Sequence, residues 1–237
     1  MPRPENKISE IFSKAILSNR TFLMEHESKT ILEAFAIPFP KYIIAKSGEE
    51  AAEAAEKLGY PVVLKILSPS IIHKSDCGGV LLNLNNKDEV KHGYDTIINS
   101  VSKIACSTEI TGVIVYKMVP TGVIELIIGA SYDNQFGHFI MVGAGGIFVE
   151  LLKDVSIRLA PISEADGEEM INELKSYPIL SGFRGGKKAD VEAATKILVK
   201  VSSLIISYPN IVELDLNPVM VYEKGACVID ARIIIRK

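Results

Sequence analysis

Apolar and polar residues alternate along the chain in short blocks whose spacing predicts both helices and strands. The alanine-rich segment after Ser47 begins with a Ser-Gly-Glu-Glu capping box and is expected to end as a helix at Gly59. Residues 61–67 form a short apolar run typical of a buried strand, and residues 80–84 predict a second strand. A second capped helix is expected from residue 86 to about residue 104.

The second half of the chain is expected to be richer in strands. Short polar separators between its apolar runs favour antiparallel neighbours. One long helix is predicted over 190–207, where apolar residues recur at helical spacing. The remaining expected elements are a helical lead-in within 1–27, strands at 111–118, 123–130 and 136–142, a helix from 163 to before Pro178, and strands at 211–216, 219–222 and 226–235.

This order of elements predicts an α+β (α/β) protein of two lobes with a seam near residues 105–115. The expected division is a helical lead-in over 1–25, a first lobe over 26–112 and a second lobe over 113–237. The interval between two lobes is a common place for a ligand, so we expect the binding site there.

Composition and charge exclude several classes of protein. The chain has 237 residues, with 26 Lys and Arg against 29 Asp and Glu and a formal net charge of −3. A nucleic-acid-binding protein normally shows a basic excess, which is absent here. Charged residues interrupt every apolar stretch, so no membrane span and no signal peptide is expected. Three scattered cysteines indicate neither a disulfide framework nor a metal motif, so the expected location is the reducing cytoplasm.

Candidate anion-binding chemistry lies around the strand at 61–67. Lys65 is in the middle of this apolar run, where its ammonium either meets an anion or extends to solvent. The glycine-rich segment after it, with Ser75, Asp76, Gly78 and Gly79, lies between two predicted strands. Backbone amides of such a turn are able to hold phosphate oxygens, although a plain hairpin turn also uses Asp and Gly.

A histidine and a carboxylate group are the next candidates. His73 adjoins the glycine-rich segment and is either an acid, base or phosphoryl acceptor, or an imidazole that hydrogen-bonds the loop. Asp215 and Asn217 share one strand face by the period of two, and Asp230 follows on the next strand. These hard oxygens suit Mg²⁺, whereas the alternative is an ordinary Asn-Pro turn. Arg158 is either a phosphate ligand or a surface residue.

The order of these signals resembles the ATP-grasp fold, and most closely the β subunits of ADP-forming acetyl-CoA synthetases. The resemblance runs from about residue 17 to residue 232. The stretches that carry it are 58–65, 71–80, 146–150, 153–158, 177–185, 213–218 and 228–232.

The resemblance implies two lobes with nucleotide between them and a reaction that converts acetyl-CoA, ADP and phosphate into acetate, CoA and ATP. It implies a CoA-binding α subunit with a phosphohistidine, in an α₂β₂ assembly, with Mg²⁺ as cofactor and ATP or ADP as substrate. The implied catalytic residues are His73 as a second phosphoryl carrier, Asp215 as the group that orients the incoming phosphohistidine, and Arg158 near the phosphates. The implied nucleotide ligands are Lys65, Ser75, Asp76, Gly78, Gly79, Lys117, Met118, Val119 and Glu125, and the implied metal ligands are Asn217 and Asp230.

Two other readings remain open. One is a different ATP-grasp ligase subunit, for example one like succinyl-CoA synthetase. The other is a non-catalytic module that senses nucleotide, against which the presence of Lys65, Asn217 and Asp230 argues.

Overall fold

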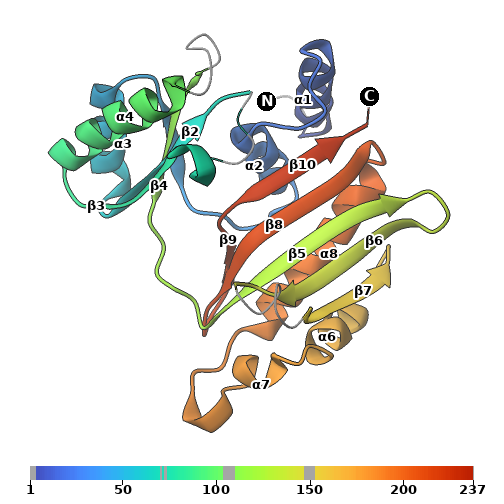
Figure 1. Cartoon of the computed structure of the whole chain (residues 1–237). Coiled ribbons are helices and arrows are strands. Elements are labelled where there is room, and N and C mark those ends of the chain that lie inside the picture. The colour runs from blue at the N-terminus through green and yellow to red at the C-terminus, as the bar shows by residue number, and fades with distance from the viewer. Residues whose placement is uncertain (1–3, 70, 72–73, 104–109, 147–152, 237) are drawn as a thin grey trace. The chain divides into compact units, whose positions relative to one another are not determined.

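A computed structural model describes residues 4–69, 71, 74–103, 110–146 and 153–236 of the chain (Figure 1). Two compact units are present: Pro40–Pro120, and a larger unit made of Met1–Phe39 together with Thr121–Lys237. This division corrects the predicted boundaries at residues 25 and 112. The N-terminal segment joins the larger unit, and the strand at 112–117 pairs inside the smaller unit instead of separating the two.

The smaller unit is a four-stranded antiparallel sheet with two helices on one face. Its strands are β1 (Tyr42–Ala45), β2 (Val62–Leu67), β3 (Val80–Leu84) and β4 (Gly112–Lys117), and its helices are α3 (Gly48–Leu58), α4 (Lys87–Ser102) and the short η1 (Ser75–Cys77). The strand order is β1-β4-β2-β3. Alternate residues of β2, such as Leu64 and Ile66, pack with α3 and α4 in one apolar core.

The caps of α3 confirm the predicted helix. The Ser47 hydroxyl accepts a hydrogen bond from the Glu50 N–H at 3.1 Å, and Gly59 ends the helix with φ 81°. The Glu50 carboxylate, however, accepts from the Lys46 N–H at 2.7 Å, so the reciprocal bond of the capping box goes to one residue earlier than expected.

The larger unit is built on a six-stranded antiparallel sheet in the order β10-β8-β5-β6-β7, with β9 also paired to β8. The strands are β5 (Ile124–Asp133), β6 (Gly137–Ala144), β7 (Val155–Leu159), β8 (Ile211–Val221), β9 (Ala226–Val228) and β10 (Ala231–Ile235). The prediction of two separate strands at 211–216 and 219–222 was wrong. β8 runs through Asn217 as one strand, with a register shift against β5 between Leu126 and Ile128.

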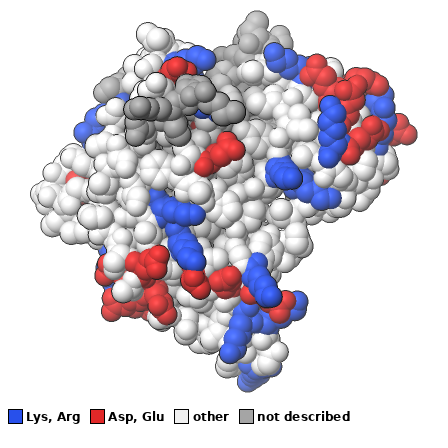
Figure 2. All heavy atoms as spheres, turned by 180° about the vertical axis from the view of Figure 1, so that it is seen from behind, with Lys and Arg blue, Asp and Glu red and all other residues white. Residues whose placement is uncertain are grey.

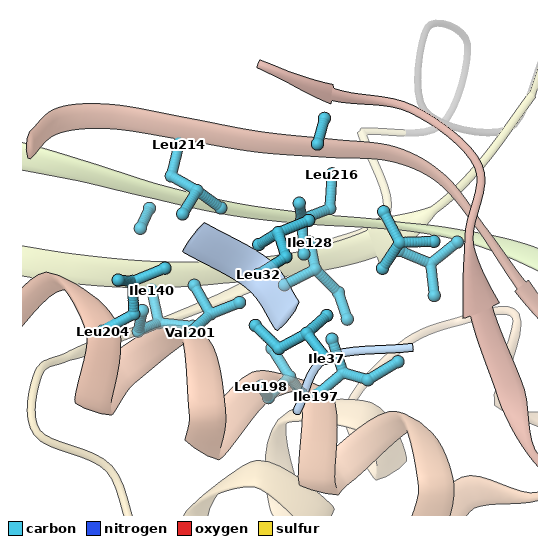
Figure 3. Close-up of a cluster of buried hydrophobic side chains, with 14 of the residues drawn as sticks. Leu32, Ile37, Ile128, Ile140, Ile197, Leu198, Val201, Leu204, Leu214 and Leu216 are labelled. Carbon is cyan, nitrogen blue, oxygen red and sulfur yellow. The ribbon is translucent and has the colours of Figure 1, made fainter. Parts of the chain in front are cut away.

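One face of the larger sheet is covered by helix and carries the core (Figure 3). The helices of this unit are α1 (Pro4–Leu17), α2 (Glu25–Ala34), α6 (Glu164–Asn172), α7 (Tyr177–Leu180), the short η3 (Phe183–Gly185) and α8 (Val191–Ser207). The apolar stripe of α8 faces the strands, as predicted. Leu198, Val201 and Leu204 lie against Ile140 and other strand residues, and burial of each such side chain contributes roughly 1.5–3 kcal/mol.

Among the described elements, α2, β1 and β7 were not predicted, and neither were the short helices α7, η1 and η3. Helix α2 has no apolar stripe in its sequence, since Glu25, Glu27 and Lys29 are among its buried residues. Strand β7 reverses the usual pattern, because its apolar residues are the exposed ones. Among the described residues, no helix is long and apolar enough to cross a membrane.

Candidate functional site

Lys65 stands in the centre of the smaller sheet. Its strand, β2, pairs with both β3 and β4, and Lys65 lies opposite Val80 and Ile114. It alternates with the core residues Leu64 and Ile66, so it points to the face that α3 and α4 do not cover. Lys65 is 7% exposed as a residue, and its Nζ lies 5.3 Å from the centre of the Tyr116 ring. A cation held in this way is suited to bind an anion as a point charge.

The loop from Lys74 to Gly79, which we call the glycine loop, folds back tightly on β2. The Gly79 N–H donates to the Lys74 carbonyl at 2.8 Å, and the Gly79 carbonyl accepts from the Ile66 N–H at 2.8 Å. A Cβ at position 79 would lie 2.6 Å from Ile66 Cγ2 and 2.9 Å from the Lys74 oxygen, so only glycine fits. The amide of Gly79 therefore shapes the loop, and its expected role in phosphate binding stays a prediction.

The structure describes some of the other predicted residues in and next to this loop, but not all of them. Asp76 is exposed, and Gly78 has φ 67°, a left-handed conformation that favours glycine. Ser75 belongs to η1 by its backbone. His73 lies outside the described residues, so its role as a phosphoryl carrier stays a prediction.

The predicted hinge at 116–119 makes hydrogen bonds to other residues of the smaller unit. Lys117 Nζ donates to the carbonyls of Gly59 at 2.9 Å and Tyr60 at 2.7 Å, and its N–H donates to Lys41. The Met118 N–H donates to the Pro61 carbonyl at 3.1 Å. The Lys117 side chain thus fastens the turn between α3 and β2. Val119, half-buried, follows directly.

In the larger unit, Asp215, Asn217 and Asp230 form a group that we call the oxygen-donor group. Leu214 and Leu216 of β8 face the core, so Asp215 between them points to the opposite face, opposite Gly129 of β5 and Arg232 of β10. Asn217 is exposed at the register shift. Asp230 immediately precedes the core-facing Ala231, which starts β10.

Backbone hydrogen bonds join the two predicted metal ligands. The Asn217 N–H donates to the Asp230 carbonyl at 3.2 Å, and the Ile229 N–H donates to the Pro218 carbonyl at 2.9 Å. The Asp230 carboxylate accepts from the Ala231 N–H at 2.9 Å. The amide of Asn217 and the carboxylate of Asp230 therefore stand on a common backbone frame.

The donor set fits a hard cation that takes few protein ligands. Among the described residues, no three His, Cys, Asp or Glu gather closely enough to hold a metal by themselves. Mg²⁺ is commonly bound through one or two protein oxygens, with phosphates and water as its other ligands. Asn217 and Asp230 offer such oxygens.

Burial raises the pKa of the Asp215 carboxyl; the Arg232 charge opposes this shift, whereas Glu213 and Asp230 add to it. The charge of Arg232 acts on two carboxylates, because its guanidinium pairs with Glu213 and also lies near enough to Asp215 to affect its pKa. Neither Glu213 nor Arg232 was singled out from the sequence as a partner of Asp215, although the period of two on β8 places Glu213 on the same face.

Glu125 lines a pocket of about 280 Å³ in the larger unit. The pocket also includes Thr121–Ile124 from the segment before it, the glycines 145 and 146, and Ile179 of α7. Gly145 donates its N–H to the Glu125 carbonyl at 2.7 Å, and a Cβ on Gly145 would lie 2.8 Å from Glu125 Cβ. Glycine at position 145 thus lets the end of β6 lie directly against Glu125.

Arg158 does not join the oxygen-donor group. It lies opposite the core residue Ile140 and therefore on the helix-covered face of the sheet. Its neighbour Ile157 lies in the same cross-strand row as Asp215, on the other face.

The Arg158 guanidinium pairs with Glu173, just beyond α6, and lies 3.5 Å from Glu169. Hydrogen bonds from Arg158 and Ser156 lower the pKa of the Glu173 carboxyl. These acidic residues belong to the acidic surface over α6 (Figure 2). The structure thus gives Arg158 a pairing role at α6, and its expected place near the phosphates stays a prediction.

Comparison with known proteins identifies the family. The model of the ATP-grasp domain matches residues 14–235. The chain belongs to the ATP-grasp family. It is 47% identical to the β subunit of ADP-forming acetate–CoA ligase I of Pyrococcus furiosus, over 97% of this chain and 98% of that protein. It is 44% identical to the ADP-forming 4-hydroxybutyrate–CoA ligase of Nitrosopumilus maritimus, over 96% of this chain and 33% of that longer protein.

A solved structure agrees with this assignment. Acetyl-coenzyme A synthetase 1 of Ca. Korarchaeum cryptofilum, in complex with coenzyme A and Ca-AMPCP, matches with a TM-score of 0.91 and 46% identity, over 96% of this chain and 99% of that chain. The same enzyme has been solved with Mg-AMPPCP and with its phosphohistidine segment pointing towards the nucleotide-binding site. The predicted family and ATP-grasp fold are thereby confirmed, and the close relatives of the chain are β subunits of ADP-forming acetate–CoA ligases.

Proposed function

We propose that the chain is the nucleotide-binding β subunit of a cytoplasmic ADP-forming acetate–CoA ligase. The observation that carries this proposal is the 47% identity to the Pyrococcus furiosus β subunit over nearly the full length of both chains. The partner is a CoA-binding α subunit that carries a phosphohistidine, in an α₂β₂ assembly. The step assigned to this chain is phosphoryl transfer between phosphohistidine and ADP.

The arrangement of the described residues supports phosphoryl transfer. This reaction needs positioning and charge neutralisation more than covalent chemistry from the protein. Lys65 supplies a held cation for the nucleotide phosphates, and Glu125 supplies an acidic group beside a pocket. Asn217 and Asp230 would hold Mg²⁺, which when bound neutralises phosphate charge. Asp215, whose pKa burial raises, is suited to hydrogen-bond an incoming imidazole and orient it.

His73 is proposed as a second phosphoryl carrier on this chain. A neutral imidazole is nucleophilic near pH 7 and forms a phosphoryl bond that is labile in acid and stable in base. The competing role is that His73 only hydrogen-bonds the glycine loop.

The acyl substrate is proposed to be chosen by the partner. Relatives named for acetate and for 4-hydroxybutyrate are similarly close to this chain, at 47% and 44% identity. The second of them is about three times as long as the matched region, so it has ample additional sequence for an acyl site. A 4-hydroxybutyrate ligase is therefore the second candidate.

Incubation of the purified chain with γ-labelled ATP and Mg²⁺, with and without the α subunit, tests the function. We expect Mg²⁺-dependent nucleotide binding by the chain alone, and acetyl-CoA formation only with the α subunit. Base-stable, acid-labile label on this chain should disappear in His73→Ala. Acetyl-CoA synthesis without a partner would contradict the subunit role. Nucleotide binding with no transfer in the complete assembly would favour a sensing module.

A further inference from the structure

Helix α2 buries a complete ion pair at the edge of the larger unit. Lys29 and Glu25 are one turn apart, their side chains are both 0% exposed, and Lys29 Nζ lies 3.9 Å from the Glu25 carboxylate. The ammonium also lies 5.2 Å from the centre of the Phe39 ring. Removing two charges from water is costly, and a buried pair often stabilises a protein no better than apolar residues of similar volume. This pair therefore calls for a role other than stability.

The ammonium of Lys29 points at the backbone next to the oxygen-donor group. Its Nζ donates to the Ile229 carbonyl at 3.4 Å, long for a hydrogen bond, so attraction between the charge and the peptide dipole is the larger part of the contact. The Ile229 carbonyl belongs to the peptide that joins residue 229 to Asp230. Lys29 thus fixes the peptide plane from which the Asp230 side chain follows.

The other side of this peptide segment is fixed as well. The Ile229 N–H donates to the Pro218 carbonyl, and the Asp230 carbonyl accepts from the Asn217 N–H. The hydrogen bonds to β8 fix the segment within the sheet, and the Lys29 ammonium of α2 contacts it from the side of the helix. Without the ammonium, the 229–230 peptide keeps its ties to β8 but loses the contact on its own carbonyl, so its orientation, and with it that of the Asp230 carboxylate, is less fixed.

We propose that Lys29 is a positioning residue for a Mg²⁺ site formed by Asn217 and Asp230, acting through the Ile229 carbonyl. The inference rests on the proposed function, because that function assigns the metal to these two residues. Residues that orient metal ligands typically change metal affinity by about 10–100-fold when they are removed. Lys29 contacts the Ile229 carbonyl oxygen, which is two covalent bonds from the Asp230 nitrogen, and not the Asp230 side chain itself. We therefore expect the smaller change in Mg²⁺ affinity, about tenfold.

Calorimetric titration of the full chain with ADP at graded Mg²⁺ concentrations tests the proposal. In Lys29→Met the Mg²⁺ concentration for half-maximal enhancement of ADP binding should rise about tenfold, while ADP affinity in EDTA stays within about twofold. The matched control is Lys200→Met, which removes a lysine that donates to another backbone carbonyl of the same unit, that of Ala36 at 2.6 Å. This control should keep the wild-type Mg²⁺ dependence.

Folding is the first concern, because Lys29→Met removes the cation that pairs with the buried Glu25 carboxylate. The double variant Glu25→Gln/Lys29→Met removes both charges at nearly constant volume and should fold, yet it should show the same shift in Mg²⁺ dependence. Lys29→Arg should restore part of the affinity, since it keeps a cation near the carbonyl.

Three outcomes separate the proposals. A lowered melting temperature with wild-type Mg²⁺ dependence in the Lys29 variants would show a merely structural lysine and overturn the inference. If Asn217→Ala shifts the Mg²⁺ dependence and the Lys29 variants do not, only the inference fails. If Asn217→Ala also leaves the Mg²⁺ dependence unchanged, the metal lies elsewhere and both proposals fail.

Discussion

In the larger unit, the oxygen-donor group lies on strands whose backbones hydrogen-bond to each other. In the smaller unit, the glycine loop belongs to the connection between β2 and β3 and directly precedes β3. Asn217 and Asp230 are linked by a main-chain hydrogen bond, which fixes the backbone of one relative to that of the other. The glycine loop has two main-chain hydrogen bonds of its own, and its shape depends in addition on the close fit of Gly79 against Ile66. Metal ligands need fixed geometry, while a loop that binds and releases phosphate needs some freedom.

The largest expected effect comes from removing a metal ligand. Asn217→Ala or Asp230→Ala should lower ATP formation from acetyl-CoA, ADP and phosphate by about 1,000-fold, because each removes a hard oxygen from Mg²⁺. ATP formation is measured in the assembly with the α subunit, and circular dichroism checks the fold. Glu223→Ala, which removes an exposed acid that pairs with Lys187, is the control and should keep full activity. Comparable activity in both ligand variants would contradict the assignment.

The glycine loop should respond through its shape. In Gly79→Ala the added Cβ meets Ile66 Cγ2 at 2.6 Å and the Lys74 oxygen at 2.9 Å, so the loop must shift. We expect a loss of about 1–3 kcal/mol in the stability of the smaller unit and about a tenfold weaker ADP affinity. Thermal melting and calorimetry measure the two effects.

Gly48→Ala is the matched control for this prediction. Gly48 is the first residue of α3 in the same unit, its added Cβ would meet neighbours only at 3.7–3.8 Å, and alanine favours the helix. It should leave ADP affinity unchanged and the stability equal or higher. Equal behaviour of the two variants would show that the tight fit at Gly79 has no influence on nucleotide binding.

The sequence predicted best those features that local chemistry determines. The cap at Ser47, the stripe of α8 and the strand around Lys65 follow from propensity and periodicity, and all three are present. The placement of Asp215 on a face away from the core follows from the period of two on β8. These predictions needed no knowledge of distant contacts.

The failures come from residues whose environment is set by distant elements. In β7 the apolar Ile157 and Leu159 are 51% and 56% exposed, while Ser156 and Arg158 turn to the side of α6 and Glu173. The apolar pattern therefore indicates the wrong face for Arg158. Lys29 is likewise buried and contacts Ile229, which lies 200 residues further along the chain, so no local pattern in α2 predicts its burial.

The pH dependence of stability tests whether the Asp215 carboxyl of the oxygen-donor group is buried. Because burial raises the pKa of Asp215, the unfolded chain ionises this group first as pH rises above about 4, and the wild type loses stability between that pH and the folded pKa. Asp215→Asn cannot ionise, so its stability relative to the wild type should increase over this window. Urea unfolding at pH 4 to 8 measures the difference.

Asp190→Asn is a control of opposite sign. Hydrogen bonds from the N–H groups of Gly225 and Ala193 lower the pKa of Asp190 at the start of α8, so its charge stabilises the fold above about pH 4. This variant should be less stable than the wild type at neutral pH, and the difference should shrink as pH falls. The same pH trend in both variants would contradict the buried environment of Asp215.

The smallest expected effect is that of Arg158, and it tests whether the two faces of the larger sheet are separate in function. Arg158→Gln removes the pairing with Glu173 on the helix-covered face and leaves the row of Asp215 intact. The pair is partly exposed, at 31% and 44%, so the loss of stability should be at most about 1 kcal/mol. ATP formation and its Mg²⁺ dependence should stay within about twofold of the wild type, since no group on the other face is disturbed.

Glu173→Gln is the control, because it breaks the same pair from the other side, and it should match Arg158→Gln in both stability and activity. A fall of 100-fold in ATP formation by Arg158→Gln, with Glu173→Gln fully active, would return Arg158 to the phosphates and mean that its pairing with Glu173 is not the arrangement used in the reaction.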